Sequence, residues 1–348
     1  MNKFLGKNTP SIRESNMELL RVLCMLFIVC GHITLAHKFD LMGDSSYYIN
    51  YFFRSFAVVA VNVYVLISGY YGIKLKVKKL GEINTMVTVY SVLFVLFSLW
   101  VGIHELQIRK DFLFLFPVIT KQYWFITVYF VLCFLSPFLN LFIDKIDKKN
   151  LERLLLTLLV CFCLLPTFSF LFNFPSITED AGYGIVNFCF LYLLGRYIRL
   201  YYRRNFSKYV YLIGYGIVAL GLCIFQLSYS YILGFPFTSL WSYDTFFVFI
   251  GAIFLFMYFR ELKIRSRLIN YVATYALSVY VLHFHPLTFS YFFNDILKVQ
   301  KYEGWEYVVL LVILPVFIYV VCMGVEFLRR CCFLAIKECI NGSRLNRF

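Results

Sequence analysis

Charged residues are scarce in this sequence. They make up 15% of the 348 residues, whereas hydrophobic residues make up 61% and aromatic residues 21%. Because an average soluble domain is about 25% charged, this composition excludes an ordinary soluble globular protein. Apolar runs of roughly 20 residues recur along nearly the whole chain, and that is the length of a helix that crosses a bilayer. We therefore predict an all-α polytopic membrane protein.

The sequence also lacks Gly/Ser-rich linkers, low-complexity segments and short-period repeats. We expect a single integral-membrane domain over residues 1–348, with no appended soluble domain and about ten transmembrane helices. The helices are predicted over residues 17–37, 49–71, 80–103, 122–143, 151–172, 183–201, 209–228, 243–260, 268–292 and 305–328.

Cysteine spacings typical of metal sites or disulfide frameworks are missing as well. The 11 cysteines lie mostly within the apolar runs, where a thiol is a small buried apolar group, so we predict no metal site. No clean signal-peptide cleavage site follows the first apolar run, which Arg21 interrupts early. We therefore expect an uncleaved first helix.

The net charge of +14 invites a nucleic-acid function, which the distribution of the charge argues against. Most basic residues fall in segments that share one side of the membrane if the N-terminus is cytoplasmic. These segments are 3–13, 74–79, 145–153, 196–208, 260–267 and 329–347. The opposite loops hold few lysines and arginines, as the positive-inside rule requires. We predict that both termini are cytoplasmic and that the protein lies in the cytoplasmic membrane. The expected partner is the lipid bilayer and not nucleic acid.

Two ionisable residues interrupt the first apolar run, Arg21 and His32. Such residues are costly inside a membrane and usually mark a functional site. Eleven residues at about 100° each return a helix to within about 20° of its start, so both lie on one stripe about 16 Å apart. Arg21 alone would be interpreted as a snorkelling residue screened by Glu18. Its alignment with His32 favours a catalytic role, with Glu18 as the partner of the guanidinium.

His32 has a simpler alternative too, that of a hydrogen-bonded packing residue near the outer interface. However, the preceding Gly31 leaves room for a ligand or a neighbouring helix. Imidazole is also the side chain best suited to accept a proton near neutral pH. We therefore predict that His32 is a catalytic base.

The turn after the second predicted helix combines a Ser-Gly pair with a group of lysines. The residues concerned are Ser68, Gly69, Lys74, Lys76, Lys78 and Lys79. The lysines alone are typical of any cytoplasmic loop. Bare backbone beside them can approach phosphates, and the cationic density suits an anionic ligand. The residues support an ordinary cytoplasmic loop and a site for an anionic ligand equally.

Polar residues also occur near the predicted outer face. They include Arg54 and Asp244, and substrate contact or interface solvation explains each of them equally well. Trp124 belongs either to the aromatic belt or to a surface on which a ligand stacks. Asn62 and Glu326 are more typical of packing or snorkelling residues.

Four motifs, in order, resemble the integral-membrane acyltransferase 3 family, which includes bacterial surface-polysaccharide O-acetyltransferases. They are ELLR at 18–21 with GH at 31–32, VLISGY at 65–70, YWF at 123–125 with SP at 136–137, and YALSVYVLH at 275–283. The LGR at 194–196 also looks like the end of the sixth helix of the family. The resemblance covers nearly the whole chain.

The resemblance implies acyl transfer from a cytoplasmic acyl-CoA, usually acetyl-CoA, to a hydroxyl of a cell-surface or lipid-linked sugar. Acyl-CoA is then a donor substrate, and no cofactor is permanently bound. The basic residue and the histidine of the family carry over to Arg21 and His32. The base could assist direct attack or carry the acyl group itself.

Two departures from the family pattern stand out. Many members carry Arg-x-x-Arg after the Ser-Gly turn, where this chain has lysines, which lack the bidentate fork of arginine. The late motif contains two histidines, His283 and His285. The spacing from Tyr280 matches His283 to the histidine of the family motif, whereas the following Pro286 matches His285 to it. We place His283 with Arg54, Trp124 and Asp244 among the acceptor-binding residues.

Two other function classes fit the same composition. A carrier or flippase for a polysaccharide precursor or an anionic solute would also need buried charges, although we find no inverted repeats of the kind that transporters show. A structural scaffold would use Arg21 and His32 for packing only. Loss of acetyl-CoA-dependent glycan O-acetylation in His32→Ala separates the enzyme from both.

Overall fold

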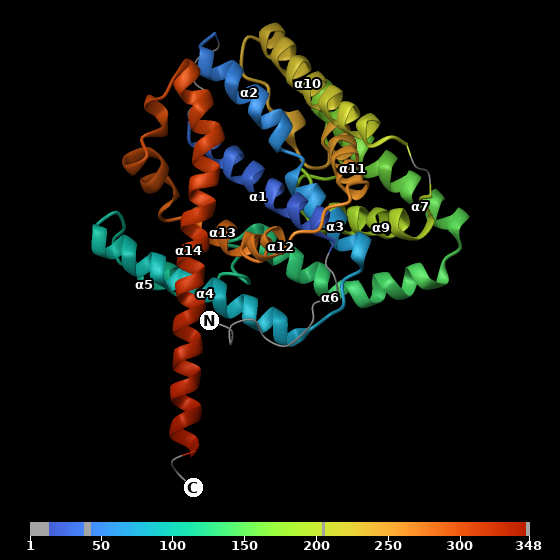
Figure 1. Ribbon diagram of the computed structural model, residues 1–348. Helices are drawn as coiled ribbons and strands as arrows, with labels where there is room; N and C mark the ends of the chain where they lie inside the picture. Colours follow the sequence, from blue (N-terminus) through green and yellow to red (C-terminus); the bar gives the residue numbers. More distant parts are fainter. Residues whose placement is uncertain (1–13, 38–42, 204–205, 346–348) are drawn as a thin grey trace.

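The computed structural model describes residues 14–37, 43–203 and 206–345, and the basic segment 3–13 lies outside this part. Within it the chain forms helices and no strand (Figure 1). The first half contains α1 Ser15–Ala36, α2 Ser45–Ala57, α3 Ala60–Tyr71, α4 Val77–Val101, α5 Ile108–Asp111, α6 Trp124–Lys145, α7 Lys148–Leu159 and α8 Leu165–Phe172. The second half contains α9 Ile185–Tyr201, α10 Lys208–Leu233, α11 Phe246–Arg260, α12 Arg267–Ala273, α13 Ala276–His283 and α14 Gly304–Leu345.

Eight helical segments of the described chain are long and apolar enough to cross a membrane. They are Ser15–Ala36, Ser45–Tyr71, Val77–Val101, Trp124–Lys145, Lys148–Phe172, Lys208–Leu233, Ser239–Arg260 and Gly304–Ile336. Each overlaps one of the predicted spans, so the prediction of an all-α polytopic membrane protein is confirmed. The predicted span 183–201 corresponds to α9, whose 17 residues cover about 25 Å and are at the short limit for a span.

The prediction of one continuous helix over 268–292 is wrong. The segment is divided into α12, α13 and a π-helical turn, Tyr291–Ile296. Pro286 explains the end of α13, because proline has no N–H for the carbonyl four residues earlier and disfavours helical backbone in the residue before it. The helix therefore stops at His283, and two irregular residues and a turn follow before helical backbone resumes.

α1 lies inside the bundle. Its neighbours are α2, α3, α11, α12, α13 and α14 (Figure 1). The buried apolar residues form two clusters, one mainly on α3, α9, α10 and α11, the other mainly on α1, α13 and α14. Ile28, Tyr64 and Phe125 pack against both clusters, and all three line the cavity described next.

α3 and α9 cross with their backbones in close contact. A Cβ atom on Gly69 would lie 2.3 Å from the carbonyl oxygen of Tyr192, and one on Gly195 would lie 2.5 Å from that of Leu66. Only glycine lets two helix backbones approach this closely. The crossing holds α3, which carries several cavity residues, in a fixed place.

Candidate active site

A cavity of about 1050 Å³ runs beside α1. Its walls come from α1, α2, α3, α4, α6, α12, α13 and α14, together with the turn between α3 and α4 and the segments that carry Tyr183, Trp241 and Tyr243. Residues of one α1 face follow each other along it, namely Glu18, Arg21, Met25, Ile28, Gly31, His32 and Leu35. Arg21 and His32 thus lie on one stripe facing one cavity, as the helical period requires.

One end of the cavity is cationic, and we call it the basic mouth. Its basic residues are Arg21, Lys74, Lys76, Lys79, Arg329 and Arg330. Glu18 accepts a hydrogen bond from Arg21 Nη1 at 2.9 Å, as predicted for this pair. Lys78, one of the lysines considered for binding an anionic ligand, is not among the described lining residues, whereas Lys79 is. Successive side chains at the start of α4 point in different directions, which separates the two lysines.

Arg329 and Arg330 were not identified as site residues from the sequence. In the structure both bind the buried Glu326, each through an Nε–Oε distance of 2.7 Å, and Tyr90 Oη donates to the same carboxylate at 2.7 Å. Glu326 is therefore a clamp for two guanidiniums, not a snorkelling residue. The i+3 and i+4 spacing in the sequence signals the ion pairs, but it does not show which cavity they face.

The role predicted for Gly69 needs correction. Its backbone does not form an open turn that phosphate could approach, because it lies inside α3 and packs on Tyr192. Ser68, its neighbour, does line the cavity. The turn that faces the basic mouth comes later and begins at Gly72, whose φ of 72° suits glycine.

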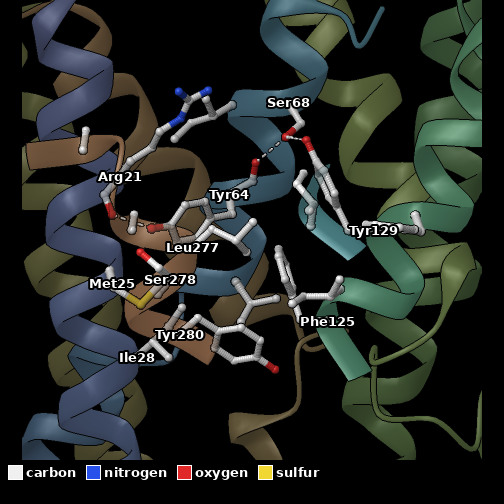
Figure 2. Close-up of a pocket in the computed structure, with 18 of the residues that line it drawn as sticks. Arg21, Met25, Ile28, Tyr64, Ser68, Phe125, Tyr129, Leu277, Ser278 and Tyr280 are labelled. Carbon is white, nitrogen blue, oxygen red and sulfur yellow. Dashed lines mark hydrogen bonds between the residues drawn. The ribbon is translucent and has the colours of Figure 1, made fainter. Parts of the chain in front are cut away.

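The middle of the cavity is lined by aromatic rings and hydroxyl groups (Figure 2). Tyr64 Oη donates to the carbonyl oxygen of Arg21 at 2.6 Å. Ser68 Oγ donates to the carbonyl oxygen of Tyr64 at 2.9 Å and lies 3.2 Å from Tyr129 Oη. Phe125 and Tyr280 continue the wall beyond them (Figure 2). This stretch can hold an extended chain that has both methylene and amide groups.

His32 contacts a second histidine far away in the sequence. Its Nδ1 lies 2.8 Å from Nε2 of His283, and Nδ1 of His283 lies 2.6 Å from the carbonyl oxygen of Val279. The His32 ring also stacks on Phe284, with ring centroids 4.1 Å apart. Of the two histidines, His32 is the one that lines the cavity. His283, predicted as an acceptor contact, lies behind it.

The structure also distinguishes His283 from His285. The His285 ring is fully buried and packs on Phe94, Phe114 and Tyr123. It is not among the described residues that line the cavity. The bend before Pro286 thus directs the two rings to different places, and only His283 reaches His32.

The other end of the cavity is rich in aromatic rings, and we call it the aromatic end. Its residues are Arg54, Trp124, Tyr183, Trp241 and Tyr243. Trp124 packs on Tyr183 and Tyr243, with centroids 4.5 and 5.8 Å apart, and the Arg54 guanidinium lies 4.5 Å from the centre of the Trp241 ring. Arg54 and Trp124, both predicted to bind the acceptor, therefore lie together beyond His32.

Asp244, the remaining predicted acceptor contact, lies elsewhere. It is buried, accepts a hydrogen bond from Thr178 Oγ1 at 3.0 Å, and is missing from the described cavity lining. Asn62 Nδ2 donates to the carbonyl oxygen of Tyr243 at 2.8 Å, which supports its predicted packing role. Both side chains hold the loops that carry Tyr183 and Tyr243.

A histidine facing a cavity, with a cationic mouth on one side and aromatic rings on the other, can transfer a group from an anionic donor to a hydroxyl acceptor. A search of curated proteins and a search of solved structures each returned no significant match. A family model described as an acyltransferase domain matches residues 14–326. The match covers most of the chain, which therefore belongs to the acyltransferase 3 family and is a multi-pass membrane acyltransferase.

Proposed function

We propose that the protein transfers an acyl group, acetyl in the first instance, from acyl-CoA to a hydroxyl of a cell-surface or lipid-linked sugar. One observation carries this proposal, namely that a single cavity joins the basic mouth to His32 and the aromatic end. Its volume of about 1050 Å³ is at the upper end of ordinary ligand pockets. Such a volume suits a long donor that meets a second substrate.

The donor fits the basic mouth and the middle of the cavity. Acyl-CoA carries phosphates at one end and the reactive thioester at the other. Arg329 and Arg330 are oriented by Glu326, and guanidiniums that are held in place bind phosphate oxygens well. Arg21 and His32 are about 16 Å apart along α1, a distance that the extended pantetheine arm can span. Hydroxyl groups of Tyr64, Ser68 and Tyr129 lie along this path.

The acceptor fits the aromatic end. Aromatic rings pack on the apolar faces of sugars, and Trp124, Tyr183 and Tyr243 offer such faces beside His32. In our proposal His32 removes the proton of the acceptor hydroxyl, and the oxygen attacks the thioester carbonyl. With the cytoplasmic termini predicted from the basic segments, the mouth faces the cytoplasm and the acceptor arrives from the other side of the cytoplasmic membrane.

The test uses membranes from cells that express the protein or its variants, supplied with radiolabelled acetyl-CoA. Expression of the wild type should transfer label to an envelope glycan fraction, and mild base should release the label as acetate. His32→Ala should abolish transfer but retain acetyl-CoA binding by the purified protein. Label that enters glycan equally with His32→Ala would overturn the proposal. A carrier would instead move an intact precursor without acquiring or transferring label.

A further inference from the structure

The hydrogen bonds around His283 determine which nitrogen of His32 carries a proton. The Val279 carbonyl can only accept, so the 2.6 Å contact requires an N–H at Nδ1 of His283. In a neutral imidazole the other nitrogen is then an acceptor, so His283 Nε2 accepts at 2.8 Å from His32 Nδ1–H. It follows that Nε2 of neutral His32 has no proton.

The unprotonated nitrogen belongs to the ring that faces the cavity. His32 lines the cavity, and its Nε2 has no hydrogen-bond partner among the described residues. Stacking on Phe284 fixes the plane of the ring. Two imidazole rings in contact would not by themselves require either direction of the hydrogen bond between them. Here the Val279 carbonyl, in the helix that ends at His283, sets it.

We propose that His283 is a positioning residue that fixes the Nδ1–H tautomer of His32 and so presents Nε2 to the acceptor. This inference rests on the proposed acyl transfer. It assigns to His283 a function other than acceptor contact. The arrangement resembles the way in which an acceptor behind a catalytic histidine selects its tautomer in hydrolases, although a neutral imidazole replaces the carboxylate.

The proton balance closes on His32 alone. The acceptor hydroxyl gives its proton to Nε2 while its oxygen forms the new bond to the thioester carbonyl. The carbon–sulfur bond then breaks, and the leaving thiolate takes the same proton from Nε2. The products are the acylated sugar and free coenzyme A. Nδ1–H of His32 donates to His283 throughout, and this bond strengthens while His32 is an imidazolium. His283 gains no proton.

The test compares two substitutions at His283. In His283→Gln the amide oxygen can replace Nε2 as the acceptor, whereas His283→Leu offers no acceptor. We expect His283→Leu to lower kcat by about 10²-fold, within the usual range for a catalytic base, and His283→Gln to stay within about tenfold of wild type. Acyl-CoA affinity should change in neither. Equal losses in both variants, or wild-type kcat in His283→Leu, would overturn the inference.

Nitrogen NMR of protein containing ¹⁵N-labelled histidine gives a readout that needs no acceptor. Neutral His32 should show a protonated Nδ1 and an unprotonated Nε2 in the wild type, and His283→Leu should lose this preference. The opposite tautomer in an active wild-type protein would overturn the inference and leave acyl transfer intact. The expected tautomer in a protein that transfers no acyl group would support the hydrogen-bond assignment and overturn the proposed function. The two failures are therefore distinguishable.

Discussion

At the scale of single residues, Arg21 and His32 lie far apart along one cavity, so their substitutions should affect different steps. Arg21 contributes to the basic mouth with Glu18 beside it, whereas His32 lies next to the aromatic end. In acyl-CoA, the proposed donor, the phosphates and the thioester are separated in the same way. Binding and turnover can therefore be tested separately.

Arg21→Ala should weaken acyl-CoA binding by about 1.5–3 kcal/mol, the usual contribution of a hydrogen bond to a charged group. Arg21→Lys should restore only part of this loss, because an ammonium group lacks the guanidinium fork. Isothermal titration of purified protein with acetyl-CoA measures both. Unchanged affinity in folded Arg21→Ala would remove Arg21 from the donor site.

Lys76 and Lys78 provide a matched pair on the same turn. Both side chains are exposed, but Lys76 lines the cavity and Lys78 is not among the described lining residues. Lys76→Ala should weaken acetyl-CoA binding measurably, and Lys78→Ala should leave it near wild type, because exposed charges away from the ligand are screened. The same titration checks the pair. A larger effect at Lys78 would contradict the cavity assignment.

His32→Ala should keep acyl-CoA affinity near wild type and lower turnover by about 10²–10⁴-fold. His32→Gln can donate and accept hydrogen bonds but cannot take up a proton near neutral pH, so it should be nearly as inactive. Steady-state rates with a fixed acceptor, together with binding data, separate the two parameters. Substantial transfer by His32→Gln would mean that His32 only orients the substrates.

At the scale of the helices, the α3–α9 crossing offers a stability test. Gly69→Ala would place a Cβ against the Tyr192 backbone and should lower stability by about 1–3 kcal/mol. Gly221→Ala in α10 is the control, because its Cβ would meet nothing within 4 Å and alanine favours helix. Thermal unfolding in detergent compares them. Equal stability of both variants would argue against the tight crossing.

At the scale of the whole molecule, the topology remains a prediction. The basic segments place both termini in the cytoplasm, and three spanning segments separate Lys79 from Asp180, namely α4, α6 and the continuous α7–α8. Reporter fusions after Lys79 and after Asp180 should therefore report opposite sides, with Lys79 cytoplasmic. Signals from the same side would contradict the span assignment and the proposed direction of transfer.

The sequence by itself determined the class of the protein, most of its spans and the shared face of Arg21 and His32. These follow from composition, from the bilayer thickness and from the period of one helix, all of which are local properties. Because α1 is one continuous helix from Ser15 to Ala36, the spacing of Arg21 and His32 places both side chains on the same helix face.

Only the tertiary structure decided what these residues meet. His32 and His283 are 251 positions apart, and their contact depends on how α1 packs against α13 and on the bend before Pro286. For Arg329 and Arg330 the sequence indicated ion pairs with Glu326 but not the cavity, and only the packing of α14 placed them at the basic mouth. Gly69 was interpreted as part of a phosphate-binding turn because the sequence does not show its close neighbour. That neighbour, Tyr192, lies on another helix. Periodicity fixes the face of one helix, but packing between distant segments chooses its partner.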